Sequence, residues 1–220
     1  MKTNLLYILI LNFLFCAICQ SQESFEGVIT FKVDVIFKKE NAPYKEYIIE
    51  KFGDTMQMFY NKKGDIHRRY KGTGPRGYDF HTYRTNTNNY YAKWKNLDTL
   101  YFNNVKENIL KFIDKEVGTS TPILNKPSKY ILIRGYVPKT NEMVNQKFYY
   151  TGYPYLDPKL YKNYKEFFTD EILQATKSPF LKFELELDDC FIIYTAISVE
   201  KRSVNPKIFK IPKNIPHKKS

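Results

Sequence analysis

The residues that most resemble a functional motif form a glycine-rich stretch at 72–77, GTGPRG. It matches the G-x-G-x-x-G pattern of dinucleotide-binding loops, and Asp98 follows about twenty residues later, where such sites carry an acidic residue. In those sites a helix begins inside the motif, so that its amide groups and dipole meet the pyrophosphate. Here Pro75 is followed by an alternating, tyrosine-rich segment without helical periodicity. The context therefore favours a connection between strands over a nucleotide site.

The three histidines, His67, His81 and His217, do not follow the spacing of a metal site. The sequence contains neither an H-E-x-x-H pair nor a C-x-x-C pair. A hairpin would bring His67 and His81 together, but zinc would still lack a third ligand with evident spacing. We interpret both as structural histidines, and we predict no metal and no cofactor.

No residue has the surroundings of a catalytic nucleophile. A G-x-S-x-G elbow is absent, and the carboxylate pair Asp188-Asp189 falls in a predicted tight turn, where Asp is favoured for backbone reasons. Cys190 starts a predicted strand and lacks the histidine signature that a nucleophilic thiol requires. We interpret it as a small buried hydrophobic residue. The sequence predicts no catalytic residue, and hence a protein that is not an enzyme.

Residues 1–21 have the pattern of a cleavable signal peptide. Lys2 provides the positive charge, residues 5–15 form an apolar run interrupted by Asn12, and small residues follow. The run is shorter than the ~20 apolar residues that a transmembrane helix needs. The sequence therefore predicts export, to the periplasm or beyond, of a single domain at 22–212 followed by a basic, flexible tail at 213–220.

The strong positive charge, +12 for the whole chain, raises the question of an anionic partner. Basic and aromatic residues interleave at 91–95 and 159–165, as in surfaces that stack bases and contact phosphates. Export removes the usual nucleic acids, so we disfavour them as partners. Anionic headgroups at a membrane surface attract the same charge and fit the predicted location better.

Alternating apolar residues predict a mainly β domain. Residues 25–37 form the first strand, and residues 180–212 form a meander of three runs, at 181–187, 190–199 and 207–211. Between them we expect a hairpin at 44–60, exposed aromatic strands at 78–94, a strand or short helix at 105–117, and strands at 129–137 and 146–151. Residues 160–176 carry the one predicted helix, because apolar residues recur there every three or four positions.

Several short motifs resemble a known group of proteins. They are FEGVITF at 25–31, IRGY at 133–136, YYT at 149–151, LDP at 156–158, PFLKFE at 179–184, TAI at 195–197 and FKIP at 209–212. Together they resemble the GLPGLI-type families of exported bacterial proteins, which are related to the LolA-like lipoprotein-carrier fold. The resemblance implies a strongly curved antiparallel sheet, an incomplete β-barrel, with one helix covering its concave side.

An incomplete barrel of this kind leaves space for an acyl chain or an apolar peptide. The resemblance therefore implies carriage or sensing of an amphiphilic ligand, with a lipid or a lipidated protein as partner. The residues expected to line the cavity are Phe31, Val33, Tyr164, Phe168, Phe183, Leu185, Phe191 and Ile193. Two alternatives stay open: these residues form a closed core, or the protein is an envelope interaction module that holds a partner protein or polyanion through its basic, aromatic exterior at 78–94.

Overall fold

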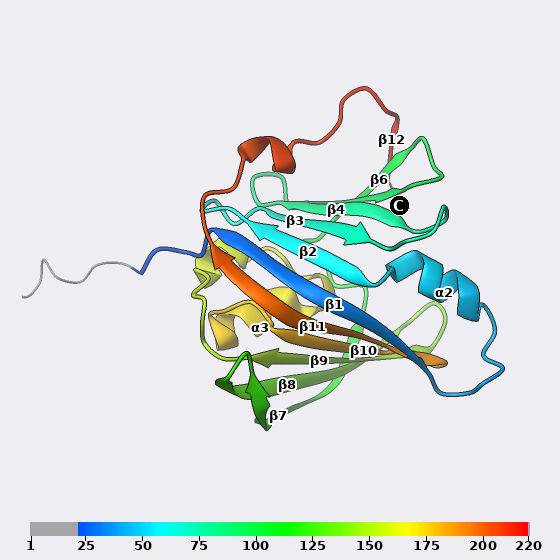
Figure 1. Ribbon diagram of the computed structural model, residues 1–220, viewed down its shortest axis with the longest axis horizontal. Coiled ribbons are helices and arrows are strands. Elements are labelled where there is room, and N and C mark those ends of the chain that lie inside the picture. The colour runs from blue at the N-terminus through cyan, green and yellow to red at the C-terminus, as the bar shows by residue number, and fades with distance from the viewer. Residues whose placement is uncertain (1–21, 220) are drawn as a thin grey trace, which may run out of the picture.

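Twelve strands form one sheet in the computed structural model, which describes residues 22–219 (Figure 1). The predicted signal peptide, residues 1–21, lies outside the described residues. The strand order is β12-β6-β5-β4-β3-β2-β1-β11-β10-β9-β8-β7, and all neighbours are antiparallel except β12 and β6. The sheet is open, with β12 and β7 as its edges. The prediction of a mainly β, antiparallel fold that is not a closed barrel is confirmed.

The strands are β1 (Gly27–Phe37), β2 (Thr55–Tyr60), β3 (Ile66–Lys71), β4 (Tyr78–Arg84), β5 (Asn89–Trp94), β6 (Leu100–Asn104), β7 (Lys111–Ile123), β8 (Lys126–Val137), β9 (Glu142–Tyr150), β10 (Lys182–Glu186), β11 (Cys190–Lys201) and β12 (His217–Lys219). The helical elements are α2 (Lys45–Phe52), α3 (Thr169–Thr176) and three 3₁₀ turns, η1 (Pro158–Tyr161), η2 (Glu166–Phe168) and η3 (Pro206–Phe209). None of the helices between residues 22 and 219 is long and apolar enough to cross a membrane.

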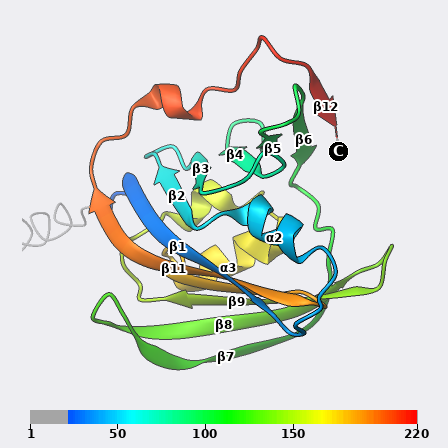
Figure 2. The same ribbon diagram turned by 45° about the vertical axis from the view of Figure 1, so that its right-hand side comes forward.

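The sheet curves around the helical segment η1–α3. Figure 2 shows this segment, in yellow, enclosed between β2–β4 on one side and β8–β9 on the other. The helix α2 lies near the opposite end of the strands, to the right in Figure 1. The concave side of the sheet is therefore covered by short helical pieces that come from two distant parts of the chain.

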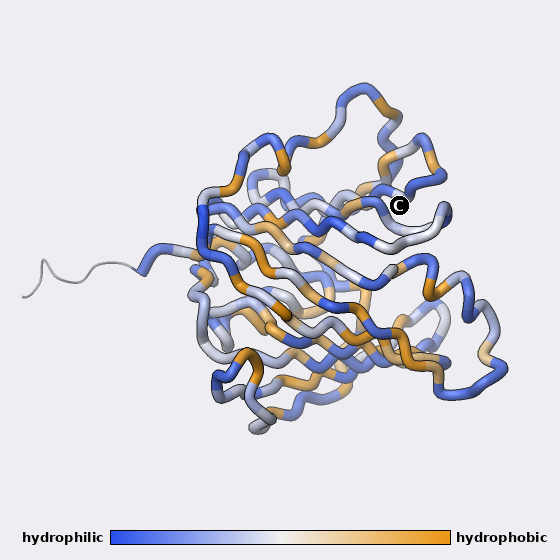
Figure 3. The backbone as a smooth tube through the Cα atoms, in the orientation of Figure 1, coloured by the Kyte–Doolittle hydropathy of each residue, from blue (hydrophilic) through white to orange (hydrophobic). Residues whose placement is uncertain are grey.

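The core lies on the concave face of the central strands. Ile29, Phe31 and Val33 alternate inward along β1 and are buried. Phe31 is opposite Ala196 on β11 and Met56 on β2, so apolar side chains continue across neighbouring strands. The apolar residues of β1 and β11 are orange in Figure 3. Because each fully buried aliphatic or aromatic side chain contributes ~1.5–3 kcal/mol, this face accounts for much of the stability.

The helix predicted at 160–176 is shorter in the structure, where only Thr169–Thr176 is α-helical. Phe167 and Phe168 have left-handed φ angles of 55° and 56°, which interrupt the helix. The amides of Lys165 and Glu166 donate to the carbonyl oxygen of Val105, at 2.7 and 3.3 Å, instead of to a preceding helical turn. The chain between β6 and β7 thus takes the hydrogen bonds that a continuous helix would have used.

Residues 45–52 are helical, whereas the sequence analysis predicted a strand there. Ile48 and Phe52 lie one helical turn apart and both pack against the core, and Phe52 meets Tyr78 edge to face at 5.6 Å. The helical spacing of these two residues was hidden in a segment with equally good strand formers. The predicted hairpin at 44–60 is therefore wrong; β2 pairs with β3 and β1 instead.

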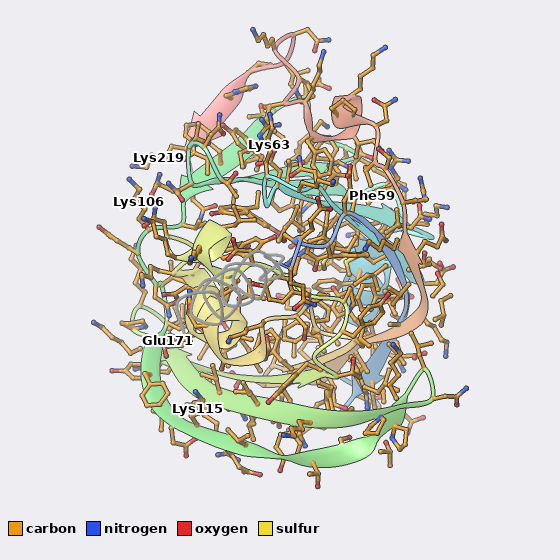
Figure 4. The ribbon with its side chains drawn as sticks, turned by 90° about the vertical axis from the view of Figure 1, so that its left-hand side faces the viewer. Phe59, Lys63, Lys106, Lys115, Glu171 and Lys219 are labelled. Atoms are coloured by element: carbon orange, nitrogen blue, oxygen red, sulfur yellow. The ribbon has the colours of Figure 1, made fainter. Side chains whose placement is uncertain are left out.

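Three further segments differ from the prediction. Residues 206–209 form η3 rather than a strand, and Phe209 packs on Phe59, which lies on the convex side of the sheet (Figure 4). Between the segments predicted at 105–117 and 129–137, β7 and β8 are joined by a tight hairpin turn with Leu124 and Asn125 both at positive φ. Within the tail predicted to be flexible, residues 217–219 form β12 along β6.

Candidate ligand-binding cavity

A cavity of about 620 Å³ lies between the concave face of the sheet and the η2–α3 segment. One wall comes from β2 to β6 and the other from β9 to β11, with the C-terminal end of α2 and residues 164–169 completing the lining. Pockets for small molecules are typically about 300–1,000 Å³. The curvature of the sheet therefore places side chains from distant strands around a space of ligand size.

The wall on the β9–β10 side is aromatic and aliphatic. Phe148 and Phe183, on neighbouring strands, stack with their ring centroids 4.7 Å apart, and Phe183 stacks on Tyr194 at 5.9 Å. Leu185 and Leu187 continue this wall toward the end of β10. Since these side chains offer no charged group, this side of the cavity suits an apolar chain.

The wall on the β3–β6 side is built from rings with polar edges. Tyr70, Tyr78, Tyr90, Trp94 and Tyr101 all line the cavity. Tyr78 lies 5.2 Å from Trp94, and Trp94 meets Tyr101 edge to face at 5.5 Å. The segment 78–94 was predicted to form exposed strands; it does form β4 and β5, but these rings face the cavity.

Arg68 is the charged side chain of this wall. It lies on β3 between the inward-facing Ile66 and Tyr70, whereas its neighbour Arg69 points to the convex side, where its guanidinium lies 5.5 Å from the ring of Phe59. Arg68 Nη1 donates a long hydrogen bond, 3.4 Å, to the hydroxyl of Tyr90. An arginine therefore stands where the alternation of β3 would otherwise place an apolar residue.

His67 and His81, on the neighbouring strands β3 and β4, lie on opposite faces of the sheet. His81 lines the cavity and its Nδ1 pairs with the hydroxyl of Tyr70 at 2.9 Å, while His67 is on the convex side with Nδ1 2.8 Å from Oγ1 of Thr82. Burial, aided by the charge of Arg69, lowers the pKa of His67 to about 4. Burial and the charge of Arg68 hold the pKa of His81 well below its usual value. Both rings are neutral at neutral pH.

Glu166 and Gln146 bring further polar atoms to the cavity. Glu166 is buried, its Oε1 accepts a hydrogen bond of 2.8 Å from Asn103, and burial raises its pKa. Gln146, on β9, is 2% exposed, and its Nε2 has no hydrogen-bond partner in the described part of the chain. The same holds for Nε of Arg68 and Nε2 of His81. Buried polar atoms are nearly always paired, so three such atoms around one cavity mark a polar site.

The structure brings together three of the residues expected to line a cavity, namely Tyr164, Phe183 and Leu185. Phe31 and Val33 are on the same concave face but are packed within the core, where Phe31 meets Phe180 at 5.2 Å. Phe168 packs in a separate cluster against β8 and β9, with its ring 5.8 Å from that of Phe112.

Phe191 and Ile193 lie on the convex face and do not line the cavity. Val33 is opposite Tyr194 and Val35 is opposite Ile192, so the even-numbered residues of this part of β11 face inward. Phe191 and Ile193 were predicted to face inward because apolar residues occupy both sides of this strand. Strand periodicity alone cannot separate the two faces in such a case.

Comparison of the sequence with protein-family models and with curated proteins finds no match. The resemblance to the GLPGLI-type families stays a prediction. Sequence reasoning missed Arg68, Gln146 and Glu166. The signal for Arg68 was present, because it interrupts an apolar alternation between Ile66 and Tyr70.

Proposed function

We propose that this protein is an exported, non-enzymatic binding protein whose cavity holds an apolar or lipidated ligand. The observation that carries the proposal is the cavity of about 620 Å³ between two largely apolar walls. Packed protein cores contain few voids larger than a water molecule, and an apolar cavity of about 150 Å³ already binds a benzene-sized ligand. The cavity, which is partly open to solvent, is large enough for such a ligand.

Location in the periplasm or outside the cell is part of the proposal and is supported by the signal-peptide pattern of residues 1–21. A membrane surface is a fitting source of ligand, because the chain has a net charge of +12. Lys63, Lys106, Lys115 and Lys219, labelled in Figure 4, are among its exposed lysines. Such charges attract anionic headgroups and release them as salt rises.

Trp94 provides the test, because it is the sole tryptophan of the chain and lines the cavity. Titration with decanol, a neutral single-chain amphiphile, is expected to change the emission of Trp94 saturably and to raise the melting temperature. Titration calorimetry should give the same affinity. A protein that takes up no neutral amphiphile, with unchanged emission and unchanged melting temperature, would refute the proposal.

A further inference from the structure

Arg68 is a half-buried cation that lines the cavity without a paired carboxylate. None of the ion pairs found between residues 22 and 219 includes it. Its contacts are instead with Tyr90: the hydroxyl accepts from Nη1 at 3.4 Å, and the guanidinium carbon lies 5.9 Å from the centre of the ring. Withdrawing a charge from water, even in part, costs free energy unless the charge is paired, so an unpaired Arg68 on this face is not explained by stability.

The groups around Arg68 do not neutralise it. Burial raises the pKa of Tyr70, Tyr90 and Tyr164 well above neutrality, so their hydroxyls carry no charge. The charge of Arg68 opposes the rise in the pKa of Glu166 that burial causes. The carboxylate of Glu166 accepts a hydrogen bond from Asn103 and does not reach ion-pair distance of the guanidinium. Lys51, at the α2 end of the cavity, adds a second positive charge.

The position of Arg68 fits the head of a ligand better than its tail. Arg68 lines both the main cavity and a smaller one of about 60 Å³ beneath α3, and Tyr164 and Phe180 line both as well. The Phe148–Phe183 wall extends away from it along β9 and β10, toward Leu185 and Leu187. A polar centre next to an apolar wall matches the two parts of a single-chain amphiphile.

We propose that Arg68 binds the anionic head of an amphiphile whose alkyl chain lies against Phe148, Phe183 and Leu185. This deepens the proposed function and rests on it. A guanidinium presents a planar fork of N–H donors that matches a carboxylate or a phosphate.

Ligands that share one alkyl chain test the head group on the unchanged protein. Decanoate, decyl phosphate, decanol and decyltrimethylammonium are compared by Trp94 emission and by calorimetry. At least one of the two anions is expected to bind about 10- to 100-fold more tightly than decanol, as for a charged hydrogen bond, and the cation more weakly than decanol. Tighter binding of decanoate assigns a carboxylate, and tighter binding of decyl phosphate assigns a phosphate. Anions that bind no better than decanol would overturn the inference.

Variants then show which residue causes the preference for an anionic ligand. Arg68→Gln should abolish the preference for the anion over decanol, while Arg68→Lys should keep part of that preference. Arg69→Gln, next in sequence but exposed on the convex face, should behave as the unchanged protein. If Arg68→Gln fails to fold, the ligand series on the unchanged protein still decides. Failure of decanol and all its analogues to bind would refute the proposed function, whereas binding of decanol without anion preference would refute the role of Arg68 alone.

Discussion

The ring of Tyr83, on β4, stacks on the ring of Tyr164 with 4.3 Å between the centroids and 29° between the planes. Both residues are buried, and Tyr164 also lines the cavity. The stack joins the η1–α3 segment to the curved sheet at the connection between η1 and η2. We infer that this contact sets the position of the segment that closes the concave side.

Removing the ring of Tyr83 or of Tyr164 should therefore lower the free energy of unfolding. Tyr83→Ala and Tyr164→Ala are each expected to reduce the free energy of unfolding by about 3–5 kcal/mol, as for other large-to-small core changes. In urea denaturation the double variant should reveal a coupling of about 0.5–1.5 kcal/mol between the rings. As a control, Tyr83→Ala combined with Tyr91→Ala, on the neighbouring strand but on the convex face, should be additive.

The sheet could be predicted from the sequence wherever one face is apolar and the other polar. Ile29, Phe31 and Val33 alternate with Thr30 and Lys32, and the structure places the first three inward. On β11 the apolar residues occupy both faces, so the choice between Phe191 and Ile192 depended on register with β1, which the sequence does not state. The local pattern thus predicted the strand but not which of its two faces points into the core.

The candidate site was predictable only in its apolar part. Phe183 and Leu185 belong to an alternating strand and were expected to line the cavity. Arg68 was not, because an arginine in a strand usually points to solvent, and its inward direction follows from pairing with Met58 and His81. Glu166 lies just before the interruption at Phe167 and Phe168, and its amide donates to the carbonyl oxygen of the distant residue Val105. The contact between Glu166 and Val105 leaves no local signal, whereas the alternation of Ile66, Arg68 and Tyr70 is a local signal that the prediction did not use.

Filling the cavity should abolish binding without disturbing the core. Ala92, on β5, lines the cavity and is half-buried, so Ala92→Phe places a ring in the space of the ligand. We expect the affinity for decanol, measured by calorimetry, to fall at least about tenfold, and stability to change by less than ~1.5 kcal/mol. Thr195→Phe, half-buried on the convex face of β11, is the matched control and should retain binding. Equal affinities for the two variants would place the ligand elsewhere.

Acid should destabilise the protein through His67. Its pKa is about 4 in the folded protein because of burial, against ~6.5 in an unfolded chain. Between these values the unfolded state binds more protons, so the free energy of unfolding falls as the pH falls, by about 3 kcal/mol in total from pH 6.5 to pH 4. His81 acts in the same direction. The raised pKa of Glu166 acts in the opposite direction, because its folded form takes up a proton more readily.

Urea denaturation across this pH range measures the effect. His67→Gln should flatten the dependence, since the amide does not titrate, while His217→Gln, on the exposed strand β12, should leave it unchanged. A slope that is the same in all three proteins would exclude His67 as its source.

We predict that the glycine-rich loop at 72–77 supports α2 and fixes its position. The amide of Gly74 donates to the carbonyl oxygen of Glu50 at 3.0 Å, and the Arg76 guanidinium pairs with the Glu50 carboxylate at 2.6 Å. At Gly77 an added Cβ would lie 2.3 Å from that same carbonyl oxygen and 2.6 Å from Cβ of Thr73. Gly77→Ala must therefore shift α2, whose Lys51 and Phe52 line the cavity.

We expect Gly77→Ala to lower stability by about 1–3 kcal/mol, as for overpacking, and to weaken decanol binding as well. Gly152→Ala separates this effect from backbone strain. Gly152 has a φ of +75° but no atom within 4 Å of its added Cβ, so the change should cost only about 1–2 kcal/mol of left-handed strain and leave binding intact. Denaturation and calorimetry on both variants distinguish the two mechanisms. Unchanged binding by Gly77→Ala would mean that the position of α2 does not shape the cavity.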